Sequence, residues 1–149
     1  MSANTNPIFT RQPDVQLGGA VLGPSANTAL DGTGANITSV FQANTTEGGF
    51  VRAMRFKPVG SPAATVARVF VCTVTGAFTP GTSNTAANTA LISEIALPSI
   101  TLSQTAATPD FEVPLNFPLN PGFRLLVAFG TSTGAAGTGY AVTTFGGRY

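Results

Sequence analysis

Short apolar runs, separated by Gly, Pro, Asn and Ser, are the main pattern along this chain of 149 residues. Within the runs apolar and polar positions alternate, and this period of two is typical of β-strands. In the sequence we find no segment of a dozen residues with apolar positions at helical spacing, and frequent Pro and Gly disfavour long helices. The pattern therefore predicts an all-β protein.

About eight strands are expected. They are predicted at residues 37–43, 50–57, 65–73, 91–97, 111–115, 123–129 and 140–145, with a short edge strand at 100–103. Since no long crossover connects them, neighbouring strands should pair mostly antiparallel. The fold class that we predict is a mostly antiparallel β-sandwich, or a jelly-roll-like barrel, with an extended N-terminal arm.

Residues 1–34 differ from the rest because their only strand-like pieces are short, at residues 8–10 and 15–17, with Pro13 between them. We therefore predict an N-terminal arm at 1–34 and a single β-sandwich domain at 35–149. The first seven residues lack a basic region followed by an apolar run, so we expect no secretory signal. Because no apolar run approaches 18 residues, we also expect no contact with a membrane.

Alternation also assigns side chains to faces. Residues 65–73 are largely apolar on both faces, which predicts a central strand. Phe123, Leu125, Val127 and Phe129 fall on one face and should be buried between the sheets. In residues 50–57, strict alternation places Arg52 on the opposite face from Arg55 and Lys57. Residues 76–88 are rich in Thr, Ala and Asn and are predicted to form a long exposed loop.

The composition narrows the range of possible functions. Charged residues make up 9% of the chain, against about 25% in typical soluble domains. The net charge of +1 lacks the electrostatic signature of a nucleic-acid binder. The absence of His and the single Cys exclude an imidazole base, a disulfide within the chain and a cysteine-cluster zinc site. We expect no catalytic residue, no cofactor and no metal.

Three segments contain residue types that could carry chemistry. Asp110 and Glu112 have the spacing of a general acid/base pair on one strand face, or of a solvated face. Asp31-Gly32-Thr33 contains residue types of an aspartic-protease loop, but in the wrong order, and a tight turn is favoured. The Gly-rich residues 130–139 lack the Lys of a phosphate-binding loop and are favoured as a hairpin loop. Cys72 is expected to be a small buried hydrophobe.

Arg52, Arg55 and Lys57 place three positive charges within six residues of a weakly charged chain. They form either a patch for an acidic partner surface or phosphate, or the long side chains of a solvated strand face. An arm such as residues 1–34 becomes ordered against something else. The partner-contact residues that we predict are Ile8, Phe9, Arg11, Arg52, Arg55 and Lys57.

A family resemblance emerges when several segments are taken in order. They are residues 6–10, 27–33, 50–56, 64–70, 114–117, 120–123 and 145–149. Together they resemble small β proteins that tailed bacteriophages and prophages encode near their head and tail structural genes. The resemblance implies a virion structural component, and we favour a capsid decoration, or cement, protein. It would lie on the capsid surface after synthesis in the host cytoplasm, bind the major capsid protein and form a homo-oligomer, with a trimer favoured.

Two other functions are weighed against this one. A tail or fibre β-sandwich could bind carbohydrate on the host surface, but sugar sites usually use aromatic platforms. The chain has no Trp and only two Tyr residues, Tyr140 and Tyr149. An enzyme such as a glycan hydrolase is the weakest alternative, because acidic residues are scarce and His is absent. A non-enzymatic structural protein is therefore the function that we predict.

Overall fold

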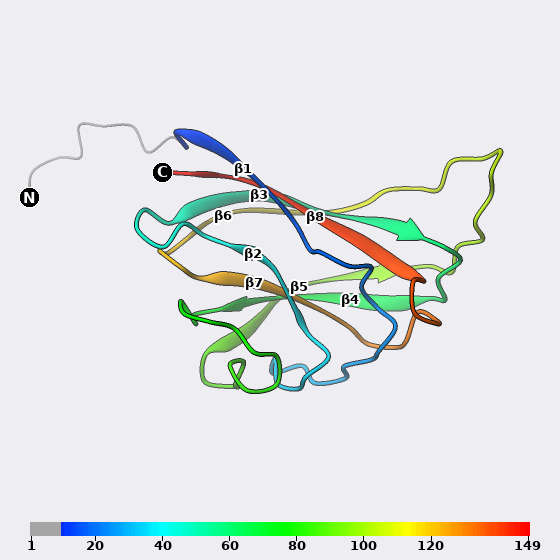
Figure 1. The fold of residues 1–149 in the computed structure, drawn as a ribbon, viewed down its shortest axis with the longest axis horizontal. Coiled ribbons are helices and arrows are strands. Elements are labelled where there is room, and N and C mark those ends of the chain that lie inside the picture. Colours follow the sequence, from blue (N-terminus) through cyan, green and yellow to red (C-terminus); the bar gives the residue numbers. More distant parts are fainter. Residues whose placement is uncertain (1–9) are drawn as a thin grey trace, which may run out of the picture.

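The computed structural model describes residues 10–149, which form a sandwich of two β-sheets (Figure 1). Its strands are β1 (Gln12–Leu17), β2 (Thr38–Gln42), β3 (Gly49–Val59), β4 (Thr65–Cys72), β5 (Thr89–Leu97), β6 (Phe111–Leu119), β7 (Arg124–Phe129) and β8 (Gly139–Arg148). This part of the chain contains no helix with the length and hydropathy needed to cross a membrane.

The two sheets have four strands each. The first sheet has the order β1-β8-β3-β6 and the second has the order β2-β7-β4-β5. All neighbouring strands are antiparallel. The chain passes from one sheet to the other at every connection except that between β4 and β5, and this strand order is that of a jelly roll. The predicted all-β, antiparallel sandwich is therefore confirmed, as is the central place of β4.

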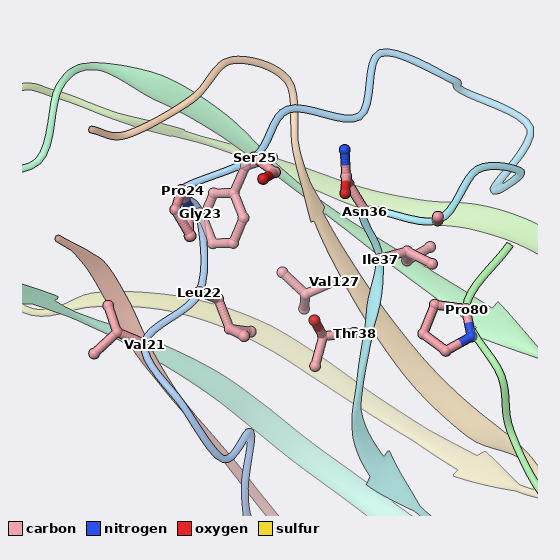
Figure 2. Close-up of a pocket in the computed structure, with 12 residues that line it drawn as sticks. Val21, Leu22, Gly23, Pro24, Ser25, Asn36, Ile37, Thr38, Pro80 and Val127 are labelled. Atoms are coloured by element: carbon pink, nitrogen blue, oxygen red, sulfur yellow. The ribbon is translucent and has the colours of Figure 1, made fainter. Parts of the chain in front are cut away.

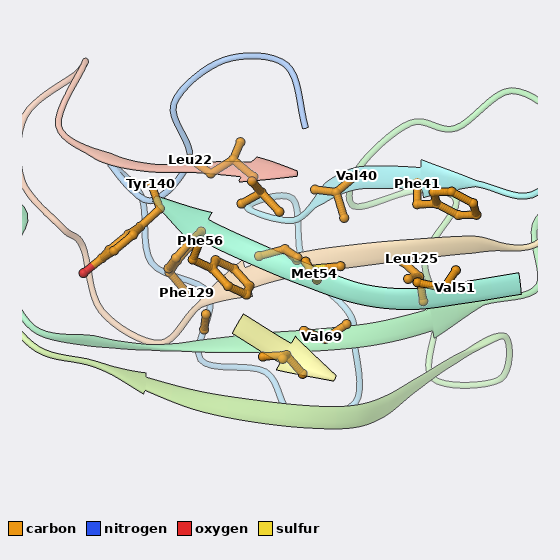
Figure 3. Close-up of a cluster of buried hydrophobic side chains, with 14 of the residues drawn as sticks. Leu22, Val40, Phe41, Val51, Met54, Phe56, Val69, Leu125, Phe129 and Tyr140 are labelled. Atoms are coloured by element: carbon orange, nitrogen blue, oxygen red, sulfur yellow. The ribbon is translucent and has the colours of Figure 1, made fainter. Parts of the chain in front are cut away.

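The main core lies between the sheets (Figure 3). Phe129 of β7 stacks on Tyr140 of β8 with ring centroids 5.9 Å apart, and it meets Phe56 of β3 edge to face at 6.4 Å. Leu125 and Val127 belong to the same buried cluster, and Phe123 packs against it. The predicted inward face of β7 is confirmed.

A second apolar cluster lies on the opposite face of β4 and β7. Its buried members are Ile37, Phe70, Cys72, Leu126 and Ala128. Val74 and Phe78, from the connection between β4 and β5, pack against it. The prediction that residues 76–88 form an exposed loop is therefore wrong in part, because this connection covers apolar side chains of the second sheet. Cys72 is fully buried, as predicted.

The predicted arm, residues 1–34, differs from the structure in its described part. Residues 12–17 are the edge strand β1, which pairs with β8 over its whole length. Leu22 then forms an isolated bridge with Tyr140, so the chain stays beside β8 beyond the strand. Residues 100–103 are not a strand but part of the connection between β5 and β6. Here β6 forms the sheet edge, where Pro114 and Pro118 are tolerated.

Strict alternation assigns residues 50–52 of β3 to the wrong faces of the sheet. The register with β8 shifts between Val51 and Ala53, so that Arg52 is an extra residue in β3. A bulge of this kind inverts the alternation that strict pairing would give. Val51, Met54 and Phe56 are buried in the core, whereas Arg52 lies outside together with Arg55 and Lys57.

The core assignment predicts a large effect of truncating Leu125, which is fully buried between the sheets. Leu125→Ala should lower the free energy of unfolding by about 2–5 kcal/mol, because it removes buried methyl groups and leaves a cavity. Urea denaturation measures the loss. Leu30→Ala is the matched control, because Leu30 is 56% exposed. A loss below about 0.5 kcal/mol for Leu125→Ala would show that this face of β7 does not form the core.

Candidate interaction surfaces

The outer face of the first sheet carries the predicted basic residues. Arg55 of β3 forms an ion pair with Glu112 of β6, with 3.2 Å between Nη2 and Oε2. Lys57 forms a second ion pair with Asp110, with 2.8 Å between Nζ and Oδ1, and Nζ also donates to the carbonyl of Thr108 at 2.7 Å. The register shift in β3 adds Arg52 to the same face. We call Arg52, Arg55 and Lys57 on this face the basic row.

The basic row is largely neutralised within the chain. Both ion pairs are about half exposed, so water and salt screen them. The hydrogen bond from Lys57 holds the pKa of Asp110 below its ordinary value. Asp110 and Glu112 thus each bind a basic side chain, which is the arrangement of a solvated strand face rather than of a shared acid/base pair. Arg52 has no ion pair among residues 10–149.

A shallow hollow of about 370 Å³ lies beside Arg52. It is lined by Thr10, Phe50, Arg52, Phe145, Gly146 and Gly147. A Cβ atom on Gly147 would lie 2.6 Å from the Cβ of Thr10, so a side chain there would displace Thr10. At the rim, the guanidinium of Arg55 lies over the ring of Phe145, 5.2 Å from its centroid. The hollow therefore combines two aromatic side chains with Arg52, a cation that has no ion pair among the described residues.

The partner-contact residues predicted in the arm are not placed in the basic row. Ile8 and Phe9 lie outside the described residues. Arg11 immediately precedes β1, where it forms an ion pair with Glu47 and donates to the terminal carbonyl of Tyr149 at 3.1 Å. Arg68 lies on β4 in the other sheet, where it pairs with Glu94 at 3.0 Å. The structure therefore brings together the three cations of the basic row but keeps Arg11 and Arg68 apart from it.

Strand β1 carries a feature that the sequence analysis missed. Its inward-facing residues are polar: Asp14 is buried, and the amide of Gln16 bonds to both the N–H and the carbonyl of Gln42. Its outward-facing residues are apolar: Val15 is 56% exposed and Leu17 is 74% exposed. The alternation in residues 12–17 was a visible signal, but alternation alone does not tell which face meets solvent.

A cavity of about 270 Å³ opens between residues 21–25 and residues 36–38, with Val127 of β7 between the two segments (Figure 2). Its lining contains apolar side chains together with Ser25, Asn36 and Thr38, and no charged group. The amide of Asn36 donates to the carbonyl of Ala26 at 2.8 Å. The cavity can admit a small neutral group, but it offers no acid or base.

The remaining chemical candidates are structural in the described residues. The hydroxyl and the N–H of Thr33 donate to Asp31 at 2.7 and 3.0 Å, and they hold the pKa of Asp31 below its ordinary value, as in a tight turn. In the Gly-rich connection, the N–H of Thr133 bonds to the carbonyl of Gly23 at 2.8 Å. Residues 10–149 contain no group of three or more His, Cys, Asp or Glu residues that could hold a metal ion.

The ion pair between Lys57 and Asp110 predicts a local pH effect. Lys57→Ala should raise the pKa of Asp110 toward its ordinary value, because the hydrogen bond that lowers it is lost. Since the pair depresses the folded-state pKa, its stabilising effect is present at neutral pH and is lost as the pH falls through that pKa. Carboxyl NMR titration measures the change. Asp31 is the internal control, because Thr33 lowers its pKa; an unchanged Asp110 would contradict the pairing.

Comparisons with known proteins add no relative. No protein-family model, no curated protein and no solved structure matches this chain.

Proposed function

We propose that the chain is a non-enzymatic structural protein of a tailed-bacteriophage virion. Within that class we propose a capsid decoration, or cement, protein that binds the major capsid protein and stabilises the assembled head. It would do so as a homo-oligomer, with a trimer favoured by the resemblance noted in the sequence. This proposal gives the protein a place on the outer surface of the capsid.

The observation that carries the proposal is the outer face of the first sheet. Two of the three cations of the basic row are matched in pairs, Arg55 with Glu112 and Lys57 with Asp110, and apolar Val15 and Leu17 are exposed on the same face. A surface with little net charge can pack against neighbouring copies on a crowded lattice with little repulsion. Exposed apolar residues gain free energy when a partner covers them. Jelly rolls also occur in viral capsid proteins, which supports the proposal by analogy of fold.

The alternative that we keep is a tail or fibre module that binds carbohydrate on the host surface. One observation favours it: Phe50 and Phe145 line the same hollow as the cation of Arg52. Aromatic rings and a cation are groups that sugar sites use. Against it, Tyr140 is fully buried with its hydroxyl bonded to the carbonyl of Pro98, so this ring cannot serve as a platform.

Binding to undecorated capsids tests the proposed function. Purified protein should bind them saturably and delay rupture by heat, because a ligand of the assembled shell stabilises it in proportion to RT ln(1 + [L]/Kd). The effect should depend weakly on salt, since two of the three cations of the basic row are already paired. Rupture temperature at low and high salt is the measurement. Binding to tails or host glycans, with no binding to capsids, would support the alternative.

A deletion of residues 1–9 tests the predicted role of the arm. The cut leaves β1 and the ion pair between Arg11 and Glu47 in place. We expect the thermal midpoint to shift by less than about 2 °C, and the affinity for capsids to fall because Ile8 and Phe9 are lost. Calorimetry and capsid sedimentation measure the two effects. A large loss of stability with unchanged capsid binding would overturn this role.

A further inference from the structure

The apolar outer side of β1 needs an explanation, because an edge strand normally turns its polar residues to solvent. Here the polar side chains have partners inside the sandwich. Asp14 lies 3.5 Å from Arg148. Gln16 bonds to the N–H and the carbonyl of Gln42 at the edge of β2, where a neighbouring strand would otherwise bond. Leu17, at 74%, is the most exposed large apolar side chain in the described residues. The outer side of β1 is therefore built like a surface that a partner covers.

The backbone of β1 has an open edge. The N–H of Gly18 donates to the carbonyl of Val142, which marks Gly18 and Val142 as a hydrogen-bonded antiparallel pair. Because such pairs recur at every second residue, the even-numbered residues of β1 bond to β8 and the odd-numbered ones point away from it. No strand of the described chain lies on that side of β1. Val15 and Leu17 thus present unpaired N–H and C=O groups there.

The other edge strands carry features that hinder pairing. Strand β6 contains Pro114 and Pro118, and Asn116 has a φ of 52°, which breaks its extended backbone. Strand β5 carries the charged Glu94 near its centre, and Gln16 covers the edge of β2 at Gln42. On β1 the odd-numbered positions 15 and 17 hold Val and Leu, with no charge, and Pro13 lies outside this stretch.

We propose that β1 is a self-recognition edge, along which a second copy of this chain pairs antiparallel through its own β1. The pairing joins two first sheets into one continuous eight-stranded sheet. It is isologous, so each copy contributes the same residues about a two-fold axis. This inference does not rest on the proposed function.

Charge restricts the register of this pairing. An axis at Asp14 would set two carboxylates opposite each other, which is repulsive. An axis at Gln16 separates the carboxylates and places the two uncharged Gln16 residues opposite each other. In that register Val15 of each copy lies opposite Leu17 of the other. These residues then exchange N–H···O bonds, and their exposed side chains become cross-strand neighbours.

The occupant that fits this edge is a second β1. A strand that adds here must be extended, apolar on its outer side and free of charge at the edge. Residues 13–17 meet all three conditions, and they pair with themselves without bringing like charges together. A two-fold contact joins copies in pairs, so in a trimeric assembly it would link one trimer to the next.

Sedimentation velocity of the full chain from micromolar to millimolar concentration tests the pairing. We expect the wild type to associate through a two-fold contact as its concentration rises. Leu17→Lys should weaken that association by about tenfold or more, because two ammonium groups would meet near the axis. Leu30→Lys is the matched control: Leu30 is a 56% exposed loop residue, and its replacement should leave association unchanged.

Two further measurements distinguish strand pairing from non-specific association. Val15→Pro removes an N–H that points away from β8, as at Pro13, and keeps an apolar side chain at an exposed position, so it should abolish association and leave the thermal midpoint nearly unchanged. The amide hydrogens of Val15 and Leu17 should exchange at least about tenfold more slowly in concentrated than in dilute protein. Either a two-fold contact that survives Leu17→Lys and Val15→Pro, or a protein that is monomeric at every concentration, would overturn the proposal.

Discussion

The structure depends on the contact of Phe129 with Tyr140 and Phe56 between the two sheets. Phe129 belongs to the second sheet, and its two partners belong to the first. Burial of an aromatic side chain of this kind contributes about 1.5–3 kcal/mol, and the ring contacts add to that. Because strand residues alternate, fixing the inward side chains also fixes which side chains a strand turns outward, except at bulges such as that at Arg52.

The outward side chains of the two sheets meet different surroundings. On the second sheet, Leu126 and Ala128 lie in a cluster that the connection between β4 and β5 covers with Val74 and Phe78. On the first sheet, charged pairs and the exposed Val15 and Leu17 face outward. Both proposals therefore concern the outer face of the first sheet. The hollow beside Arg52 lies on the same face, and it is the site where carbohydrate would bind under the alternative proposal.

Much of the fold follows from local sequence, because a period of two and turn residues are local signals. The inward face of β7 and the central position of β4 were predicted in this way. The outward position of Arg52 was not, since the bulge that produces it is a matter of pairing with β8, almost a hundred residues later. Strand β1 was predicted only as a strand-like piece of an arm, because it is short and its partner β8 lies far away in the sequence. Strict alternation separated Arg52 from Arg55 and Lys57, whereas the structure places all three on one face, and the ion pairs of Arg55 and Lys57 join β3 to distant residues around the start of β6.

The central claim is that this chain is a component of the shell of a virion and is present in many copies. Quantitative mass spectrometry of purified virions, with the major capsid protein as internal standard, measures that number directly. A decoration protein should be present in hundreds of copies, in a fixed ratio to the capsid protein. A few copies for each particle, or none, would contradict the account.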